Sequence, residues 1–105
     1  GAVVNPCARV GVGVIVNTGA VVDHDTVIGD FAHVSANATM GGASQLGSLS
    51  LLGIGAVVLP GIRVGARSIV GAGGVVVRDL PNDVVAIGVP ARIHRTVGSQ
   101  AAARS

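Results

Sequence analysis

Residues 20–46 read AVVDHDTVIGDFAHVSANATMGGASQL, and an aliphatic residue or Met returns at every sixth position: Val22, Ile28, Val34, Met40 and Leu46. The same register extends without an insertion from Val4 to Val76 and contains thirteen such residues. The residue two positions earlier is small in eleven of the thirteen repeats, and the residue that follows is Gly in seven. The sequence is therefore a six-residue repeat over most of its length.

This period excludes the two common regular structures, because side chains recur every 3.6 residues in a helix and every 2.0 in a strand. A short strand followed by a tight corner has the observed period. Three such units close a triangular coil of 18 residues, and successive coils hydrogen-bond about 4.8 Å apart along the axis. We predict an all-β parallel β-helix of about four coils over residues 1–78. The aliphatic residues fill the interior, small residues lie where the walls converge, and Gly tolerates the corner dihedrals.

The composition agrees with a narrow tube. The chain has 105 residues, 17 of them Gly, and its one aromatic residue is Phe31. A conventional core of this length usually contains several large rings. A mean hydropathy of +0.72 with 11% charged residues excludes disorder for most of the chain. The length allows one domain.

The charges exclude several classes of function. All seven basic residues are Arg and all five acidic residues are Asp, and the net charge of +2 arises from Arg92, Arg95 and Arg104. No basic stripe alternates with aromatic residues, so we expect no nucleic-acid binding. The charge-free stretch 41–62 contains six Gly as well as Ser, Gln and Pro, so we expect no membrane span. No secretory signal is visible, and the single Cys7 cannot form an internal disulfide, so we expect a cytoplasmic protein.

Three segments resemble one known family. They are NTGAVVDHDTVIGDFAHVSANATMGG at 17–42, LLGIGAVVLPGI at 51–62 and GVPAR at 88–92. Together with the repeat they resemble the hexapeptide-repeat acyltransferases, in the branch of sialic acid O-acetyltransferases and bacillosamine N-acetyltransferases. The resemblance implies a left-handed β-helix and a homotrimer with active sites between neighbouring subunits. It also implies acetyl transfer from acetyl-CoA to an amine or hydroxyl of a sugar or sugar nucleotide.

His24 is the candidate catalytic residue. Its match to the family motif implies that it is the general base and that Asp25 raises its basicity. Attack on a thioester requires proton removal near neutral pH, and imidazole is the side chain whose pKa suits that task. A carboxylate near the other ring nitrogen fixes the tautomer and stabilises the imidazolium. Asp23 also flanks His24, and the spacing does not choose between the two carboxylates.

The resemblance places acetyl-CoA contacts at His33, Ile54 and Ala72, and we assign Asn17 to acceptor binding. Where the family often has Gly, this chain has Ala72. His33 lies nine residues from His24, half a coil, so we expect the two histidines on different faces, able to meet only across a subunit boundary. Ile54 and Ala72 are 18 residues apart, so they should stack along one side of the tube, where an extended pantetheine arm would lie.

We expect no metal site, because the coils contain only His24 and His33 and lack a close His pair. We expect His94 to be a solvated residue near the terminus and Cys7 to serve packing. Two alternative functions stay open: an acetyltransferase for a serine- or galactoside-type acceptor, and a non-catalytic trimeric scaffold. The DHD segment at 23–25 favours the sugar branch over the first, and coenzyme binding would exclude the second.

The register ends after residue 78. We predict that residues 79–95 cap the last coil, beginning with a turn at Pro81–Asp83, because an open coil end is an exposed strand edge. We expect 96–105 to be a flexible tail, with a short helix as the alternative. Members of the branch usually carry a preceding α/β domain that holds the sugar nucleotide, and here about one coil precedes Asn17. The resemblance therefore supports acetyl-CoA more strongly than the acceptor.

Overall fold

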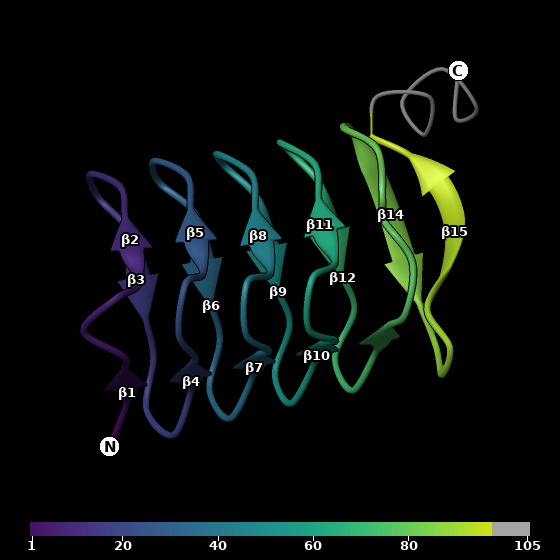
Figure 1. Cartoon of the computed structure of the whole chain (residues 1–105). Helices are drawn as coiled ribbons and strands as arrows, with labels where there is room; N and C mark the ends of the chain where they lie inside the picture. The colour runs from purple at the N-terminus through teal and green to yellow at the C-terminus, as the bar shows by residue number, and fades with distance from the viewer. Residues whose placement is uncertain (98–105) are drawn as a thin grey trace.

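The computed structural model describes residues 1–97, which wind into a row of stacked coils (Figure 1). Two-residue strands alternate with four-residue corners. The strands are β1 (Val3–Val4), β2 (Arg9–Val10), β3 (Ile15–Val16), β4 (Val21–Val22), β5 (Val27–Ile28), β6 (His33–Val34), β7 (Thr39–Met40), β8 (Gln45–Leu46), β9 (Leu51–Leu52), β10 (Val57–Val58), β11 (Arg63–Val64), β12 (Ile69–Val70) and β13 (Val75–Val76). The second residue of each strand is the aliphatic residue or Met of the repeat. The six-residue period is therefore one strand and one corner.

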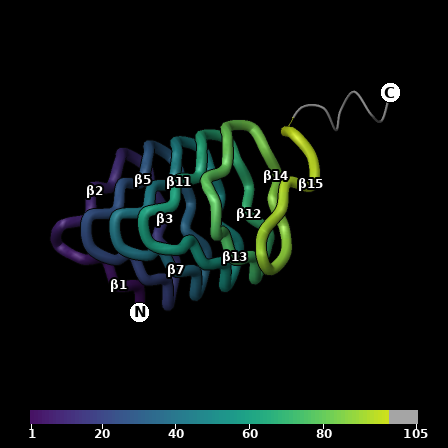
Figure 2. The backbone as a smooth tube through the Cα atoms, turned by 45° about the vertical axis from the view of Figure 1, so that its right-hand side comes forward, coloured from purple at the N-terminus to yellow at the C-terminus, as the bar shows by residue number. Residues whose placement is uncertain are grey.

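Strands three apart in the chain pair in parallel and form three sheets. Sheet A contains β1, β4, β7, β10 and β13; sheet B contains β2, β5, β8 and β11; sheet C contains β3, β6, β9, β12 and two C-terminal strands. Partners lie 18 residues apart, as in Val22 with Val4 and Met40. The predicted parallel β-helix is confirmed and is consistent with the left-handed type. Figure 2 shows its nested coils, which number about five, one more than the repeat predicted.

We name each corner by the sheets that it joins. Corner AB comprises residues 5–8, 23–26, 41–44, 59–62 and 77–80. Corner BC comprises 11–14, 29–32, 47–50 and 65–68, and corner CA comprises 17–20, 35–38, 53–56 and 71–74.

The interior is a column of aliphatic side chains. Ten of the thirteen repeat residues are buried: Val22, Ile28, Val34, Met40, Leu46, Leu52, Val58, Val64, Val70 and Val76. Val4 and Val10 stay exposed because no coil lies beneath the first one within residues 1–97. Phe31 lies outside the core, at corner BC, with 60% of its surface exposed. The tube therefore has no aromatic ring in its interior, as its composition indicated.

The glycines that follow the aliphatic residue serve a purpose other than the predicted one. None of these seven residues has a positive φ. A Cβ atom at Gly47 would lie 2.4 Å from the backbone nitrogen of Ala66, and one at Gly29 would lie 2.5 Å from that of Ser48. Glycine is required there because the next coil passes too close for a side chain. The prediction that these glycines provide corner dihedrals was wrong.

The left-handed conformation instead occurs two residues later in the corner. Gly13, Gly19, Gly55, Gly61 and Gly73 have φ near +70°, and Asp25, Phe31, Asn37, Ala43, Leu49 and Arg67 have φ between 55° and 60°. Non-glycine residues rarely adopt this region, and Asn and Asp do so most readily. Six of these corners therefore direct a side chain outward from a strained backbone, and one of these side chains is Asp25.

A hairpin closes the C-terminal end of the tube. Strand β14 (Val84–Ile87) extends sheet C beside β12, and β15 (Arg92–Thr96) pairs with it antiparallel. The Arg67 Nε donates to an Asp83 carboxylate oxygen at 2.7 Å, and this pair lowers the pKa of Asp83 and raises that of Arg67. The strand reaches Thr96, the first residue of the predicted tail, and residues 98–105 of that tail lie outside the described residues.

Candidate functional site

His24 and Asp25 lie together at corner AB in the second coil. The His24 Nδ1 is 3.2 Å from the Asp25 Oδ2, and their side chains are 59% and 70% exposed. Asp23 is engaged elsewhere, because its Oδ1 accepts the backbone N–H of His24 at 2.7 Å. The geometry therefore pairs the imidazole with Asp25, the choice that the spacing left open. An Nδ1–H that donates to Asp25 leaves Nε2 as the ring nitrogen able to accept a proton.

The His24 ring extends over the next coil, where it meets Gly42. A Cβ atom at Gly42 would lie 2.7 Å from both Cε1 and Nε2 of the ring. Gly42 is stacked on His24 because the two residues are 18 positions apart on the same corner. Sequence reasoning missed this residue, although the 18-residue coil would have placed it. The His24 ring can occupy this position only because residue 42 has no side chain.

We expect Gly42→Ala to lower the rate of the reaction proposed below without unfolding the chain. The new methyl would displace an exposed ring, which moves easily, so the free energy of unfolding should change by less than about 1 kcal/mol. A displacement of the base by about 1 Å can lower the rate roughly 100-fold. Steady-state kinetics and thermal unfolding measure the two effects. If the substitution acts through the ring, it should have no further effect on rate in a His24→Ala background.

His33 lies on the other side of the tube. It belongs to β6 in sheet C, where it pairs with Ile15 and Leu51 on the neighbouring strands. Its Nε2 is buried and has no hydrogen-bond partner among residues 1–97. An unpaired buried polar atom costs free energy. His24 and His33 thus occupy different sides of one chain, as their spacing predicts.

The other predicted residues gather at corner CA, beside sheet C. Ile54 is 62% exposed, and Ala72 is stacked above it, since the Gly73 N–H donates to the Ile54 carbonyl at 2.8 Å. Asn17 lies on the same corner in the coil nearest the N-terminus, and its Oδ1 accepts the Thr18 N–H at 3.0 Å. The chain therefore divides the predicted residues in two groups. His24 and Asp25 form one, and Asn17, His33, Ile54 and Ala72 lie around sheet C and corner CA.

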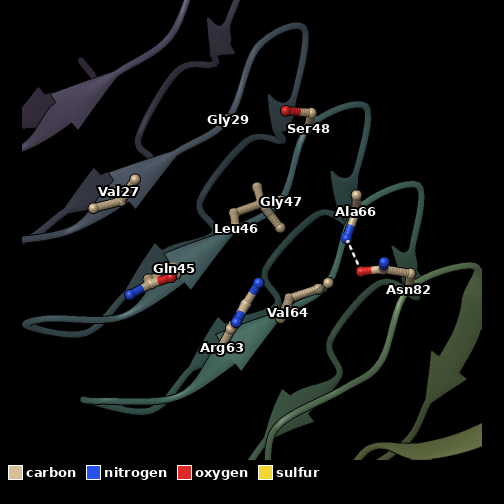
Figure 3. A pocket seen from close by; sticks show the side chains of 11 residues that line it. Val27, Gly29, Gln45, Leu46, Gly47, Ser48, Arg63, Val64, Ala66 and Asn82 are labelled. Atoms are coloured by element: carbon tan, nitrogen blue, oxygen red, sulfur yellow. Dashed lines mark hydrogen bonds between the residues drawn. The ribbon is translucent and has the colours of Figure 1, made fainter.

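A hollow of about 300 Å³ lies elsewhere, on the outer face of sheet B and at corner BC (Figure 3). Val27, Gln45 and Arg63 form a row across its neighbouring strands, and the Ala66 N–H donates to the Asn82 Oδ1 at its edge. None of the predicted site residues lines it. It is a shallow depression on sheet B, whose outward residues include the polar Gln45 and Arg63. The candidate site lies away from it.

Three further observations concern the rest of the surface. Within residues 1–97, no three His, Cys, Asp or Glu side chains lie close enough to hold a metal ion. The same residues contain no helix of sufficient length and hydrophobicity to cross a membrane. Cys7 is exposed at corner AB, so the expectation that it serves packing was wrong.

Comparison with curated proteins identifies relatives of one enzymatic class. The serine acetyltransferase of Synechococcus elongatus is 32% identical over 103 residues, which is 89% of this chain and 42% of that protein. The serine acetyltransferase 5 of Arabidopsis thaliana is 39% identical over 100 residues, 86% of this chain and 32% of that protein. The chain thus spans less than half the length of these relatives. No family model matches the sequence.

Solved structures agree in fold and add coenzyme complexes. PerB from Caulobacter crescentus, solved with CoA and GDP-perosamine, is 46% identical with a TM-score of 0.79, over 90% of this chain and 54% of that one. The acetyltransferase domain of PglB from Neisseria gonorrhoeae, solved with acetyl coenzyme A, is 34% identical with a TM-score of 0.79, over 88% and 54%. The serine acetyltransferase of the same organism is 30% identical with a TM-score of 0.87, over 99% and 45%.

Proposed function

We propose that this chain, a β-helix of the hexapeptide-repeat acetyltransferase family, forms a homotrimer that transfers an acetyl group from acetyl-CoA to an amine or hydroxyl of a sugar or sugar nucleotide. The observation that carries the proposal is the exposed His24–Asp25 pair on a scaffold whose relatives have been solved with CoA. The other predicted residues lie on the opposite side of the tube, so a complete site requires a second subunit.

The outer faces of the tube differ in polarity. The outward residues of sheet A are apolar except for Thr39, and the exposed or partly exposed ones are Val3, Val21, Thr39, Val57 and Val75. Sheet C presents Ile15, His33, Leu51 and Ile69, whereas sheet B presents Arg9, Val27, Gln45 and Arg63. A closed ring with three-fold symmetry needs two different contact surfaces on each subunit. The proposed site needs corner AB of one subunit beside corner CA of its neighbour, so these two surfaces would be sheet B and sheet C, with the exposed Phe31 and Leu49 of corner BC nearest the three-fold axis.

In the proposed reaction, His24 is the general base. Its Nε2 takes the proton of the acceptor amine or hydroxyl as that group attacks the thioester carbonyl carbon, and the Asp25 carboxylate stabilises the imidazolium. The carbon–sulfur bond then breaks, and the coenzyme leaves as a thiolate that takes the proton from His24. The products are the acetylated acceptor and free CoA. No covalent intermediate with the protein is required.

The residues around sheet C belong, in this proposal, to the coenzyme side of the neighbouring subunit. His33 would contact the coenzyme near the thioester, and Ile54 and Ala72 would line the pantetheine arm. The methyl of Ala72 leaves less space there than Gly would. Asn17 is proposed to contact the acceptor. Its position at corner CA means that it reaches an acceptor held at His24 of a different subunit, not of its own.

Two observations bear on the acceptor. PerB is the relative solved with a nucleotide-linked amino sugar, and its identity over this chain exceeds the 30–39% of the serine acetyltransferases reported above. A serine acceptor is the second candidate, favoured by the number of serine acetyltransferases among the relatives. A thiol-release assay with amino-sugar nucleotides, sialic acid and serine distinguishes them. Turnover of serine alone would overturn the sugar assignment.

Calorimetric titration with CoA tests the enzymatic assignment itself. We expect saturable binding with one coenzyme for each subunit. Absence of binding at millimolar CoA would favour a non-catalytic scaffold. A cytoplasmic location stays a prediction.

A further inference from the structure

The corner that carries His24 is closed by a side chain. In the other three AB corners that precede the cap, the backbone N–H of the fourth residue donates to the carbonyl of the first. These bonds join Ala8 to Asn5 at 2.9 Å, Ser44 to Gly41 at 3.1 Å and Ile62 to Leu59 at 3.2 Å. Among the hydrogen bonds of residues 1–97, the Thr26 hydroxyl replaces this backbone donor, and its Oγ1 donates to the Asp23 carbonyl at 3.0 Å. Thr26 is fully buried, so its hydroxyl depends on a partner within the protein.

A second side chain holds the opposite end of the same peptide group. The peptide bond between Asp23 and His24 contributes the Asp23 carbonyl and the His24 N–H. The carbonyl accepts the hydroxyl of Thr26, and the N–H donates to the Asp23 Oδ1 at 2.7 Å. Both polar atoms of this planar group are therefore bonded to side chains of the corner. The orientation of the plane sets the φ angle of His24.

The peptide group that follows His24 is held by the next coil. The His24 carbonyl accepts the Ala43 N–H at 2.9 Å, and this bond sets the ψ angle of His24. The direction of the Cα–Cβ bond depends on the two peptide planes that flank it. The contact of the ring with Asp25 and its position over Gly42 therefore depend on the hydrogen bonds of Asp23, Thr26 and Ala43.

We propose that Thr26 and Asp23 are positioning residues for His24, which they orient by holding the peptide group between residues 23 and 24. This proposal rests on the proposed function, in which His24 is the base. Neither side chain touches the reacting atoms. Asp23 serves through an acceptor oxygen and not through its charge, because the Asn17 Oδ1 makes the same bond to the N–H of Thr18 at 3.0 Å.

Ser44 shows that the tube itself does not require a hydroxyl bond at this place. It is stacked on Thr26, 18 residues later in the same corner position, and is also fully buried. Its Oγ has no hydrogen-bond partner within residues 1–97. Ser44→Ala is therefore a matched control, which removes a buried hydroxyl from the same column without removing a bond.

The kinetic test compares removal of each bond with its retention. Thr26→Val keeps the shape of the side chain without the hydroxyl, and Asp23→Ala removes the acceptor. We expect each to lower kcat about tenfold, since misplacement of the base by a fraction of 1 Å affects the transition state, while KM for acetyl-CoA stays within about twofold. Thr26→Ser and Asp23→Asn keep the bonds and should restore kcat to within about twofold of the wild type. Ser44→Ala should leave kcat unchanged.

A second readout does not depend on turnover. One Gly42 hydrogen takes the place of a Cβ and points at the His24 ring, so NMR should show a nuclear Overhauser effect between this hydrogen and the ring Hε1. We expect it in the wild type, Thr26→Ser, Asp23→Asn and Ser44→Ala, and a weaker one in Thr26→Val and Asp23→Ala. Asp23 is only partly buried, so its two variants carry the test if Thr26→Val does not fold.

Three outcomes would overturn the proposal. They are unchanged kcat and an unchanged Overhauser effect in both removal variants, a loss in Thr26→Ser equal to that in Thr26→Val, and a loss in Asp23→Asn equal to that in Asp23→Ala, which would assign Asp23 a role through its charge. If the wild type transfers no acetyl group, the proposed function fails, whereas the Overhauser effects still show whether Thr26 and Asp23 orient the ring. The two failures are therefore distinguishable.

Discussion

Replacement of His24 by Ala is expected to lower kcat about 1,000-fold and to leave the fold intact. General acid–base catalysis by a positioned side chain contributes roughly 100- to 10,000-fold to a rate, and no other imidazole of the same chain lies at this corner. The side chain is more than half exposed and contacts the rest of the chain through Asp25 and over Gly42, so its loss removes little packing. Steady-state kinetics and thermal unfolding measure the two quantities.

Two variants control for this substitution. His94→Ala removes an exposed imidazole from β15 and should leave kcat unchanged. Asp25→Asn keeps the size of the side chain but removes the charge that stabilises the imidazolium, so it should lower kcat less than His24→Ala does. Turnover retained by His24→Ala within tenfold of the wild type would mean that another group is the base.

The second large effect concerns stability. Gly47→Ala should lower the free energy of unfolding by about 3 kcal/mol, because the new methyl would lie 2.4 Å from a backbone nitrogen of the next coil, which has little freedom to move. That loss corresponds to a decrease in Tm of roughly 15 °C for a domain of this size. Thermal unfolding at fixed protein concentration measures it, since the proposed trimer would make Tm depend on concentration.

Gly55→Ala is the matched control. Gly55 has φ of +69° and open space around its Cβ position, so the substitution should cost only about 1 kcal/mol of backbone strain. Ala43 already occupies the equivalent place in another corner with φ of 60°. Close approach between coils is thus the expected main constraint on glycine in this fold. A greater loss of stability in Gly55→Ala than in Gly47→Ala would show that the corner dihedral is the stronger constraint.

The sequence predicted the architecture well because each six-residue repeat corresponds to one strand and one corner, and three repeats make one coil. Each aliphatic position had only one place in a triangular tube, and the 18-residue distance between Ile54 and Ala72 was enough to place them on one corner. The same arithmetic placed His24 and His33 on different sides. A fold with insertions would not have allowed this, because an inserted loop would have broken the count along the chain.

The sequence did not predict features that depend on distances between coils. The glycines after the aliphatic residues were assigned to corner dihedrals, since a sequence does not distinguish a residue that needs a positive φ from one that needs space. The choice between Asp23 and Asp25 depended on which carboxylate accepts a backbone N–H, and that is Asp23. The antiparallel hairpin at residues 84–96 lies outside the repeat, so periodicity gave no information about its strands.

Activity in mixed trimers tests the central claim most directly, namely that one catalytic site combines His24 of one subunit with His33 and corner CA of its neighbour. His24→Ala and His33→Ala, each with little activity alone, are refolded together at equal concentrations. Random mixing places an intact His24 beside an intact neighbouring His33 at about one site in four. We predict recovery of about a quarter of the wild-type activity. No recovery from trimers shown to contain both variants would contradict the account and place the whole site within one chain.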